Sequence, residues 1–383
     1  MQLQNFDTAS FLRDYWQKKP LLIRAGLCPW VDPLDPNELA GLSLEQGTES
    51  RLVIQGEGGP SVEHGPQDSE RLSKLPTSGW TLLVQAVDHQ VPEVAALIEP
   101  FRFVPNWRID DVMVSCAADG GGVGPHYDQY DVFLVQGAGK RRWQVGAKCD
   151  ETTPLVAENE LMLIDGFEAT DEWVLETGDI LYVPPGYAHN GVAVGDGCMT
   201  YSIGFRAPAR SELIAHWTDH LIDEMAEDDR YSDPALAMQA NPGEIAPAAI
   251  DALHAMVTEK LGDRAAFARW FGEYSTAPKY PDVDWQPEEP VSAGDMRDLI
   301  ASGAALLRNP ASRWSFAGGE GGAVSLFVDG ASYDCTGETA SLAEAICAAD
   351  RIDLGPDAAT DEASRELLVA LINQGSLAFE QED

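Results

Sequence analysis

Three residues in this chain could hold a metal ion together. His126 and Asp128 lie two positions apart in Gly124-Pro-His-Tyr-Asp-Gln-Tyr-Asp-Val-Phe-Leu-Val, and in an extended chain such positions point to the same face. Glycines at 120–122 and 124 let the backbone turn tightly beside a cavity. His189 follows a strand that ends in Pro-Pro-Gly and supplies a third ligand. Two histidines and one carboxylate form the facial triad of non-haem Fe(II) oxygenases, which leaves coordination positions open for co-substrate and O2.

Each of these residues could also have a purely structural role. Taken alone, a His-x-Asp tripeptide is weak evidence, and a hydrogen bond between His126 and Asp128 at a barrel rim accounts for it better. Inside an apolar barrel, however, Asp128 is costly unless it is paired or binds a metal. His216 and His220 lie four apart on an expected helix, a spacing that can also bind metal, but they fall on its solvent side. The context therefore favours His126, Asp128 and His189.

A run of three cations follows in the same region. Alternate residues of a strand over 140–145 share a face, with Arg141, Trp143 and Val145 on one and Lys140, Arg142 and Gln144 on the other. The face with Trp and Val should be interior, so Arg141 is buried and needs an anion. Its planar guanidinium suits a carboxylate, as a dicarboxylic co-substrate such as 2-oxoglutarate would provide. Ser115, on an earlier strand, could add a hydroxyl to the same carboxylate; an internal salt bridge to an Asp is the alternative.

The elements that position these residues are short strands. From about 107 to 206, Gly-rich turns separate candidate strands at 111–116, 130–136, 141–145, 173–176, 180–183, 191–194 and 199–205. Many short strands with this punctuation predict a β-barrel or sandwich of the jelly-roll type. Before them, we expect a helix over 7–24 that gives way to a strand at 21–24, then long loops from 28 to 78, and a helix over 91–100.

After Pro208 the pattern becomes helical. One apolar stripe contains Leu213, Ile214, Trp217, Leu221 and Ile222, and further helices are expected over 248–261 and 264–274. Prolines between 278 and 290 indicate a linker. The tail predicts a helix over 292–306, a β-hairpin (313–316 and 325–328, with a turn at Asp329-Gly330), and helices over 341–349 and 361–373. Helices with a small β-wing are typical of a winged-helix module.

The bulk composition excludes several classes of protein. A formal net charge of -38 argues against sequence-independent DNA or RNA binding, and the acidic tail after 311 makes a DNA-reading winged helix improbable. The excess of acidic residues could bind a basic protein partner. Adaptation to a salty cytoplasm is favoured, because this excess occurs along most of the chain. The six cysteines are scattered, as expected of reduced thiols in a cytosolic protein. Neither an export signal nor a membrane span is recognised.

Several motifs together resemble a known family. Gly120-Gly-Gly-Val-Gly-Pro-His-Tyr-Asp, Gly139-Lys-Arg-Arg-Trp-Gln-Val-Gly, Glu176-Thr-Gly-Asp-Ile-Leu-Tyr-Val-Pro-Pro-Gly-Tyr-Ala-His-Asn-Gly and Met199-Thr-Tyr-Ser-Ile-Gly-Phe-Arg-Ala-Pro resemble the JmjC-type 2-oxoglutarate oxygenases. More narrowly, they resemble the bacterial ribosomal oxygenases that hydroxylate an arginine of large-subunit ribosomal protein L16. The resemblance extends over nearly the whole chain, from Phe11-Leu-Arg-Asp-Tyr-Trp to Leu368-Val-Ala-Leu-Ile-Asn-Gln-Gly-Ser-Leu-Ala-Phe-Glu.

The resemblance implies an α+β fold with a double-stranded β-helix (jelly-roll, cupin/JmjC-like) core. Three regions are expected: a JmjC catalytic domain over 1–207 with its β-helix core at about 107–206, a helical dimerisation region over 208–277, and a winged-helix-like domain over 278–383. His126, Asp128 and His189 match the family's iron ligands. Arg141 matches its 2-oxoglutarate partner, and Ser115 lies where a co-substrate contact is expected.

The implied activity is hydroxylation at the β-carbon of an arginine in a large-subunit ribosomal protein, with Fe(II), 2-oxoglutarate and O2, by a cytoplasmic homodimer that binds neither DNA nor membrane. Two alternatives remain open from the sequence. Another JmjC activity, such as hydroxylation of His or Asn or lysine demethylation, would use the same site. A non-enzymatic cupin-like binding protein would need neither metal nor Arg141.

Overall fold

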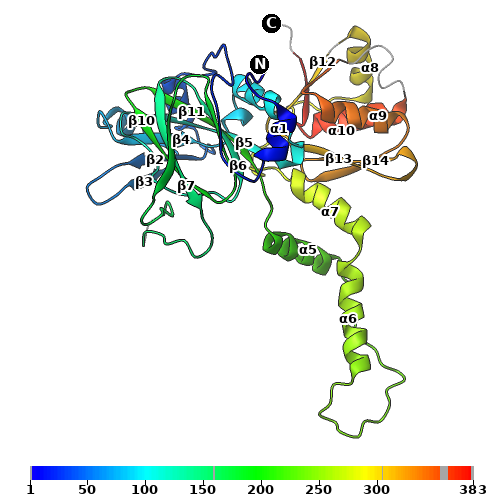
Figure 1. Ribbon diagram of the computed structural model, residues 1–383. Helices are drawn as coiled ribbons and strands as arrows, with labels where there is room; N and C mark the ends of the chain where they lie inside the picture. Colours follow the sequence, from blue (N-terminus) through cyan, green and yellow to red (C-terminus); the bar gives the residue numbers. More distant parts are fainter. Residues whose placement is uncertain (1, 158–159, 304, 354–360, 381–383) are drawn as a thin grey trace. The chain divides into compact units, whose positions relative to one another are not determined.

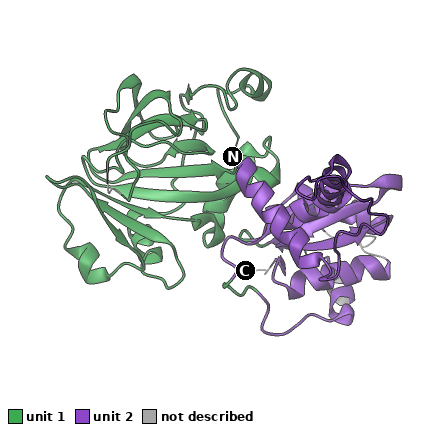
Figure 2. Cartoon of the chain, turned by 90° about the horizontal axis from the view of Figure 1, so that it is seen from below, with its two compact units in different colours: residues 1–207, 282–285, 309–311 green, residues 208–281, 286–308, 312–383 purple. Residues whose placement is uncertain are grey.

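The computed structural model describes residues 2–157, 160–303, 305–353 and 361–380, and the chain divides into two compact units (Figures 1 and 2). Unit 1 comprises residues 1–207, 282–285 and 309–311, and unit 2 comprises 208–281, 286–308 and 312–383. Within the described residues, no helix is both long and apolar enough to cross a membrane.

Unit 1 begins with an extension of short helices and strands. Its elements are α1 (Thr8–Asp14), β1 (Leu21–Ile23), α2 (Pro36–Leu42), β2 (Ser50–Ile54), β3 (Ser61–His64), α3 (Ser69–Ser73), β4 (Trp80–Val84), η1 (Val87–His89), α4 (Pro92–Ala95), η2 (Ala96–Phe101) and η3 (Asn106–Arg108), where η denotes a 3₁₀ helix. The helix expected over 7–24 ends at Asp14, because Gln17 adopts a left-handed φ of 57° and Pro20 follows. The helix expected over 91–100 is one α-turn continued as a 3₁₀ helix that contains Pro100.

The rest of unit 1 contains the seven strands expected between 107 and 206. They are β5 (Ile109–Ala117), β6 (Asp131–Gln136), β7 (Lys140–Lys148), β8 (Ala169–Leu175), β9 (Ile180–Val183), β10 (Tyr187–Val194) and β11 (Cys198–Phe205). Together with β1, β2, β3 and β4 of the extension, they form two antiparallel sheets, one of eight strands in the order β1-β9-β6-β11-β5-β4-β2-β3 and one of three in the order β10-β7-β8. This pair of sheets is the arrangement of a jelly roll.

Alternation along the strands gives the large sheet two different buried faces. On one face, Phe133 and Tyr182 pack with Phe11 of the extension in an aromatic core. On the other face, Leu134 and Leu181 pack with Trp143 of the small sheet. The extension therefore covers the outside of the large sheet, and the space between the two sheets is the barrel interior.

Unit 2 begins with three helices, α5 (Arg210–Glu224), α6 (Pro247–Leu261) and α7 (Arg264–Thr276). Trp217 and Leu221 of α5 are buried against Trp270 of α7. Ile214 and Ile222 belong to the same sequence stripe but are 59% and 58% exposed. The apolar stripe of α5 is thus wider than the surface that α7 covers.

The remainder of unit 2 contains two small sheets and three helices. Its elements are α8 (Ala293–Ser302), β12 (Ala305–Arg308), β13 (Trp314–Gly318), η4 (Glu320–Gly322), β14 (Val324–Val328), β15 (Ala331–Cys335), α9 (Glu338–Ala348), β16 (Arg351–Asp353), α10 (Glu362–Asn373) and β17 (Leu377–Phe379). The sheets have the orders β16-β12-β17 and β13-β14-β15. One continuous core, which includes Trp314, Leu326 and Leu371, joins them to the helices.

One expectation for this region was wrong and another was incomplete. The helix expected over 292–306 ends at Ser302 and strand β12 follows, because Gly303 takes a left-handed φ of 79° and breaks the helix. The expected hairpin is confirmed, since β13 pairs with β14, but a third strand extends it into a three-stranded sheet. Asp329 and Gly330, with φ of 50° and 82°, form a turn from β14 into β15, which the sequence did not reveal as a strand.

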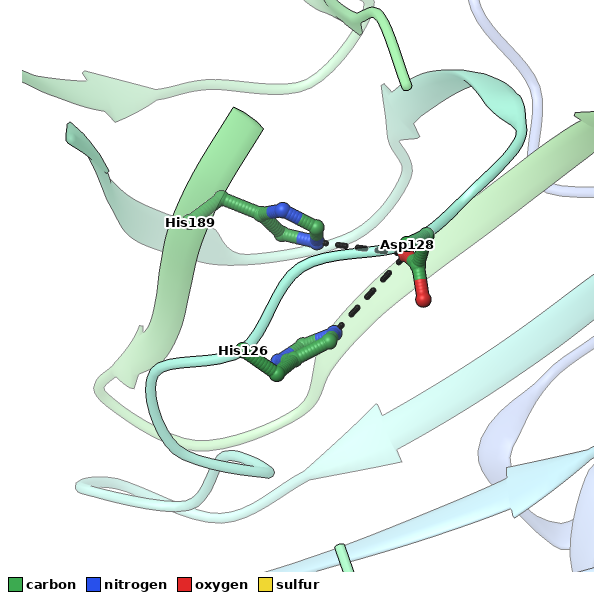
Figure 3. Close-up of side chains that lie close together, drawn as sticks. All are labelled: His126, Asp128 and His189. Carbon is green, nitrogen blue, oxygen red and sulfur yellow. Dashed lines mark ion pairs between the residues drawn. The ribbon is translucent and has the colours of Figure 1, made fainter. Parts of the chain in front are cut away.

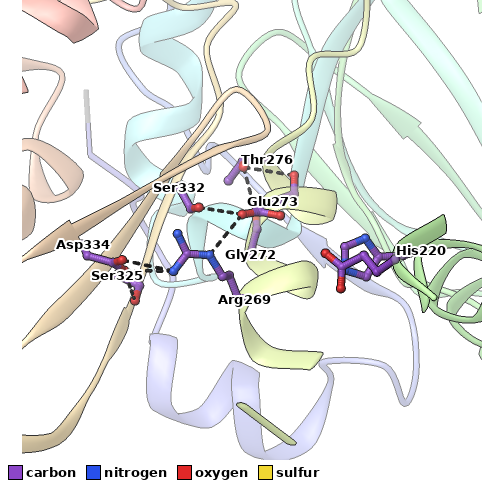
Figure 4. A network of polar contacts seen from close by, with 9 residues as sticks. His220, Arg269, Gly272, Glu273, Thr276, Ser325, Ser332 and Asp334 are labelled. Carbon is purple, nitrogen blue, oxygen red and sulfur yellow. Dashed lines mark hydrogen bonds and ion pairs between the residues drawn. The ribbon is translucent and has the colours of Figure 1, made fainter. Parts of the chain in front are cut away.

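Helix α7 packs directly on the β13-β14-β15 sheet. Figure 4 shows its polar contacts: Arg269 Nη1 lies 3.0 Å from Asp334 Oδ1, and Ser332 donates a hydrogen bond to Glu273 at 2.6 Å. A Cβ on Gly272 would lie 2.4 Å from the ring of Phe327, so glycine permits this close approach. The β13-β14-β15 sheet therefore packs on α7, the last of the three helices that begin unit 2.

Candidate functional site

His126, Asp128 and His189 come together at the edge of the barrel. His126 and Asp128 lie in the segment between β5 and β6, and His189 lies on β10. His126 and His189 exchange backbone hydrogen bonds of 3.0 and 2.8 Å, and Gly186 N donates to the Asp128 carbonyl at 2.7 Å. The His-x-Asp segment thus lies outside β6, and pairing with the strand that carries His189 fixes its position.

The three side chains point toward one another (Figure 3). The Oδ2 atom of Asp128 lies 3.6 Å from Nε2 of His189 and 3.9 Å from Nε2 of His126, and one ligand atom from each residue lies within 4.8 Å of the others. Among the residues that the structure describes, this is the single group of three or more His, Cys, Asp or Glu side chains that converge in this way. The donor set fits a divalent metal such as Fe(II), because two imidazoles and one carboxylate occupy one side of the ion and leave other positions open.

The histidines are held in an orientation suited to metal binding. Nδ1 of His126 lies 2.8 Å from the carbonyl oxygen of Gly124, and Nδ1 of His189 lies 3.0 Å from that of Tyr187. With Nδ1–H donated to a carbonyl, the lone pair of Nε2 is free for a metal. Burial, and then the positive charge of His126, lower the pKa of His189 to about 4. His189 is therefore neutral at physiological pH, as a metal ligand must be.

Close backbone contacts explain two glycines at this edge. A Cβ on Gly122 would lie 2.2 Å from the carbonyl oxygen of Gly191, and a Cβ on Gly191 would lie 2.6 Å from the ring of Trp143. Larger residues would push the His126 segment away from β10, or β10 away from Trp143. These glycines allow the ligands from two segments to approach one ion.

Arg141 lies inside the barrel, as the alternation along its strand predicted. Arg141, Trp143 and Val145 are buried, whereas Lys140 is exposed and Arg142 is half-buried. The Arg141 guanidinium donates from Nε to Cys198 Sγ at 3.4 Å and lies 5.8 Å from the Trp143 ring. Its Nη2 atom is buried with no hydrogen-bond partner, and no ion pair of Arg141 occurs within the described part of the chain. The alternative of an internal salt bridge receives no support.

Ser115 is buried in β5 and pairs with Thr200 of β11. Its neighbours Val114 and Cys116 belong to the aromatic core outside the large sheet, so Ser115 points into the barrel interior. It therefore lies on the same side of the large sheet as the space that Arg141 faces.

His216 and His220 do not form a metal site. His220 stacks on Trp217 at a centroid distance of 5.5 Å and lies 3.7 Å from Glu224, whereas His216 packs beside Tyr274. Their spacing reflects packing along α5 and not a shared ligand.

Sequence reasoning missed Cys198, which accepts a hydrogen bond from Arg141, and Gln136, which contacts Cys198. Cys198 begins β11 and is fully buried, and Gln136 ends β6 with its amide 3.6 Å from the same sulfur atom. Strand alternation could have assigned Gln136 to the interior, because it is two residues beyond Leu134. The contact of Cys198 with Arg141 joins distant strands and leaves no local signal.

Comparisons with known proteins agree with this arrangement. Residues 96–213 match the JmjC domain and residues 259–378 match the ROXA-like winged helix. The chain is 38% identical over 370 residues to the ribosomal protein uL16 3-hydroxylase of Escherichia coli, covering 97% of each chain. It is 38% identical over 275 residues to a probable ribosomal oxygenase of Haemophilus influenzae, covering 68% of this chain and 66% of that one.

Solved structures show the same fold. The structure of the E. coli ribosomal oxygenase YcfD in complex with cobalt and 2-oxoglutarate superposes with a TM-score of 0.87 at 37% identity, covering 99% of both chains. The expected α+β fold, with a jelly-roll core and a winged-helix domain, is therefore confirmed. With this likeness along almost its entire length, the chain belongs to the JmjC-domain ribosomal oxygenases.

Proposed function

We propose that the protein is an Fe(II)- and 2-oxoglutarate-dependent oxygenase that hydroxylates the β-carbon of an arginine in large-subunit ribosomal protein uL16. The observation that carries the proposal is the His126, Asp128 and His189 group with a buried guanidinium, that of Arg141, unpaired in the same barrel. The E. coli protein that is similar to this chain over 97% of its length is named a ribosomal protein uL16 3-hydroxylase. Position 3 of an amino acid is its β-carbon.

In this proposal His126, Asp128 and His189 hold the iron, which supplies oxygen activation when it is bound. Arg141 pairs with the distal carboxylate of 2-oxoglutarate, and the Ser115 hydroxyl donates to the same group. A buried guanidinium without a protein anion carries a large desolvation cost, which a bound carboxylate offsets. The triad and Arg141 thus bind opposite ends of the co-substrate and fix its direction in the barrel.

Tyr130 lies near Asp128, and the protein as a whole is strongly acidic. Loss of hydration around its hydroxyl, and then the negative charges of Asp128 and Asp111, raise the pKa of Tyr130. The side chain is nevertheless 44% exposed, so we infer that the ring faces solvent while the hydroxyl lies beside the carboxylates. The net charge of -38 favours approach of a basic ribosomal protein.

We further propose that residues 1–207 form the catalytic domain, 208–277 a dimerisation region and 278–383 the winged-helix-like domain of a cytoplasmic homodimer. Exposed apolar residues on α5 and α6 support the dimer: Ile214, Ile222, Ile250, Leu253 and Val257. A second copy that covers these helices would bury the part of the α5 stripe that α7 leaves open. Light scattering after gel filtration tests the stoichiometry, and Val257→Asp should shift it toward monomer.

Mass spectrometry tests the activity directly. Ribosomal protein uL16, incubated with enzyme, Fe(II), 2-oxoglutarate and O2, should gain one oxygen atom on an arginine. Histone-like peptides and histidine-containing ribosomal peptides serve as comparison substrates, because relatives with demethylase and histidyl-hydroxylase names match between about a fifth and about half of this chain. Oxygen on a histidine, or lysine demethylation without any change in uL16, would contradict the proposal.

A further inference from the structure

The guanidinium of Arg141 has a neutral partner on the neighbouring sheet. Its Nε–H donates to the thiol of Cys198 at 3.4 Å, while Nη2 is buried and has no partner among the described residues. Arg141 and Cys198 are 5% and 0% exposed, so water does not compete for this contact. The contact holds one side of the planar guanidinium and leaves the other side for a ligand.

A second residue holds Cys198 in place. Nε2 of Gln136 donates to the carbonyl oxygens of Met199 and Ala138, both at 3.0 Å, and lies 3.6 Å from Cys198 Sγ. Gln136 is fully buried. It connects the start of β11, where Cys198 lies, to the turn between β6 and β7 that leads to Arg141. The thiol and the guanidinium are therefore fixed relative to each other from both strands.

We propose that Cys198 is a positioning residue for the co-substrate: braced by Gln136, it orients the Arg141 guanidinium toward the distal carboxylate of 2-oxoglutarate. This inference rests on the proposed function of Arg141. With Nε–H directed to the sulfur atom, rotation about the Cδ–Nε bond is restricted and the two Nη groups face the barrel interior. A carboxylate then binds to the Nη pair without first ordering the side chain.

The chemistry of the thiol suits this role. A carboxylate at position 198 would also orient Arg141, but it would neutralise the guanidinium and compete with the co-substrate. Elsewhere in unit 1 such pairing occurs, since Arg108 Nη2 lies 2.9 Å from the buried Asp131. A neutral thiol is a weak hydrogen-bond acceptor, so it fixes the geometry of Arg141 and leaves its charge available.

Calorimetric titration of 2-oxoglutarate, under anaerobic conditions and with Mn(II) in place of iron, tests the proposal without turnover. Cys198→Ala should raise the Kd about 5- to 10-fold, the loss expected for one hydrogen bond of ordinary strength, because sulfur is a weak acceptor. Cys198→Ser keeps a hydrogen-bond acceptor and most of the side-chain volume, so its Kd should lie between those of the wild type and Cys198→Ala. In turnover assays the KM for 2-oxoglutarate should rise, while kcat at saturating co-substrate stays nearly constant.

The matched control is Cys116→Ala. Cys116 is also a buried thiol, on β5 of the same sheet, but it packs in the aromatic core on the opposite face. This variant should lower stability and leave the Kd within about twofold of wild type. The Cys116 side chain lies on the face of the sheet opposite Arg141, so alanine removes a weak electrostatic interaction with that guanidinium and not a hydrogen bond to it.

A double-mutant cycle with Arg141→Lys separates positioning from general packing. Lysine keeps the positive charge but has no Nε–H for the thiol, so Cys198→Ala should cause little further loss in that background. An equal loss in both backgrounds would overturn the inference. An unchanged Kd in Cys198→Ala and Cys198→Ser, with a raised Kd in Arg141→Lys, would overturn it and leave the proposed anchor intact. If Arg141→Lys and Arg141→Ala also bind 2-oxoglutarate normally, the proposed role of Arg141 itself fails. Should Cys198→Ala not fold, the serine variant alone decides.

Discussion

Each unit of this protein buries an arginine beside a tryptophan, and the two arginines differ in their partners. In unit 2 the guanidinium of Arg308 lies 5.3 Å from the Trp314 ring, and its Nη1 lies 3.5 Å from Asp350. In unit 1 the guanidinium of Arg141 lies 5.8 Å from the Trp143 ring and contacts a thiol instead of a carboxylate. A buried cation with a protein anion serves the fold, whereas one without an anion is suited to a charged ligand.

The same contrast extends to the two interiors. The core of unit 2 is a continuous set of apolar side chains around Leu326, Leu368 and Leu371. The barrel interior combines an apolar cluster around Leu134 and Trp143 with His189, Arg141 and Ser115, all of them buried. Burying these polar groups costs free energy, and binding of metal and co-substrate explains why they are tolerated.

The largest effect should come from removing the carboxylate of the triad. Asp128→Ala leaves two imidazoles and is expected to abolish metal retention and turnover, because a divalent ion then loses its charged ligand. The fold should persist, since Asp128 is partly exposed and its backbone contact with Gly186 does not need the side chain. Metal content after dialysis and 2-oxoglutarate decarboxylation measure this. Asp350→Ala in unit 2 is the control and should keep the metal content and the turnover of the wild type. Retained turnover in Asp128→Ala would refute the assignment of Asp128 as a metal ligand.

The two arginines should respond in opposite ways to the same change. Arg141→Met is expected to weaken 2-oxoglutarate binding by at least about 50-fold, as loss of charged hydrogen bonds implies, while the melting temperature stays constant or rises. The rise is expected because an unpaired buried charge is removed. Arg308→Met should bind the co-substrate normally but lose about 1 kcal/mol of unfolding free energy with its Asp350 contact. Anaerobic calorimetry measures 2-oxoglutarate binding by the two variants, and denaturant unfolding measures their stability.

If Arg141→Met lowered stability as much as Arg308→Met and left binding unchanged, the contrast between the two arginines would disappear. Arg141 would then be a structural residue of the barrel.

Strand alternation and turn chemistry made much of this site predictable. The alternation over 140–145 assigned Arg141 to the interior, and the Pro-Pro-Gly turn located His189 at the start of a strand. Errors arose where one glycine decided the outcome: Gly303 ends a helix whose apolar pattern continues into β12. The contact between Arg141 and Cys198 was not predictable, because 57 positions separate the two residues and only the tertiary fold brings them together.

Truncation of one leucine in each interior should separate their roles. Leu371→Ala in unit 2 and Leu134→Ala in the barrel are each expected to cost about 2–5 kcal/mol of unfolding free energy, since both side chains are almost fully buried. Only Leu134→Ala should also weaken 2-oxoglutarate binding, because Leu134 belongs to the cluster that contains Trp143. Hydrogen exchange identifies the destabilised unit. Equal weakening of binding by Leu371→Ala would show that the two cores are energetically coupled.

The smallest effect concerns pH and the metal-free protein. Because burial lowers the pKa of His189 from 6.5 to about 4, the unfolded chain binds a proton in this interval that the folded barrel does not. Unfolding free energy should therefore rise with pH between about 4 and 6.5, and acidification through this interval should loosen the barrel. In unit 2, His216 and His254 are exposed and His220 is half-buried, whereas His189 in the barrel is buried.

Denaturant unfolding at several pH values, with hydrogen exchange to assign the unit, measures this slope. His189→Gln removes the titrating group and should flatten the slope of the barrel without changing that of unit 2. Glutamine has a volume close to that of histidine and stays neutral, so a flattened slope reports the proton and not lost packing. If the wild type and His189→Gln lose stability equally on acidification, other groups account for the acid sensitivity of the barrel. The contrast between the interiors would then rest on ligand binding alone.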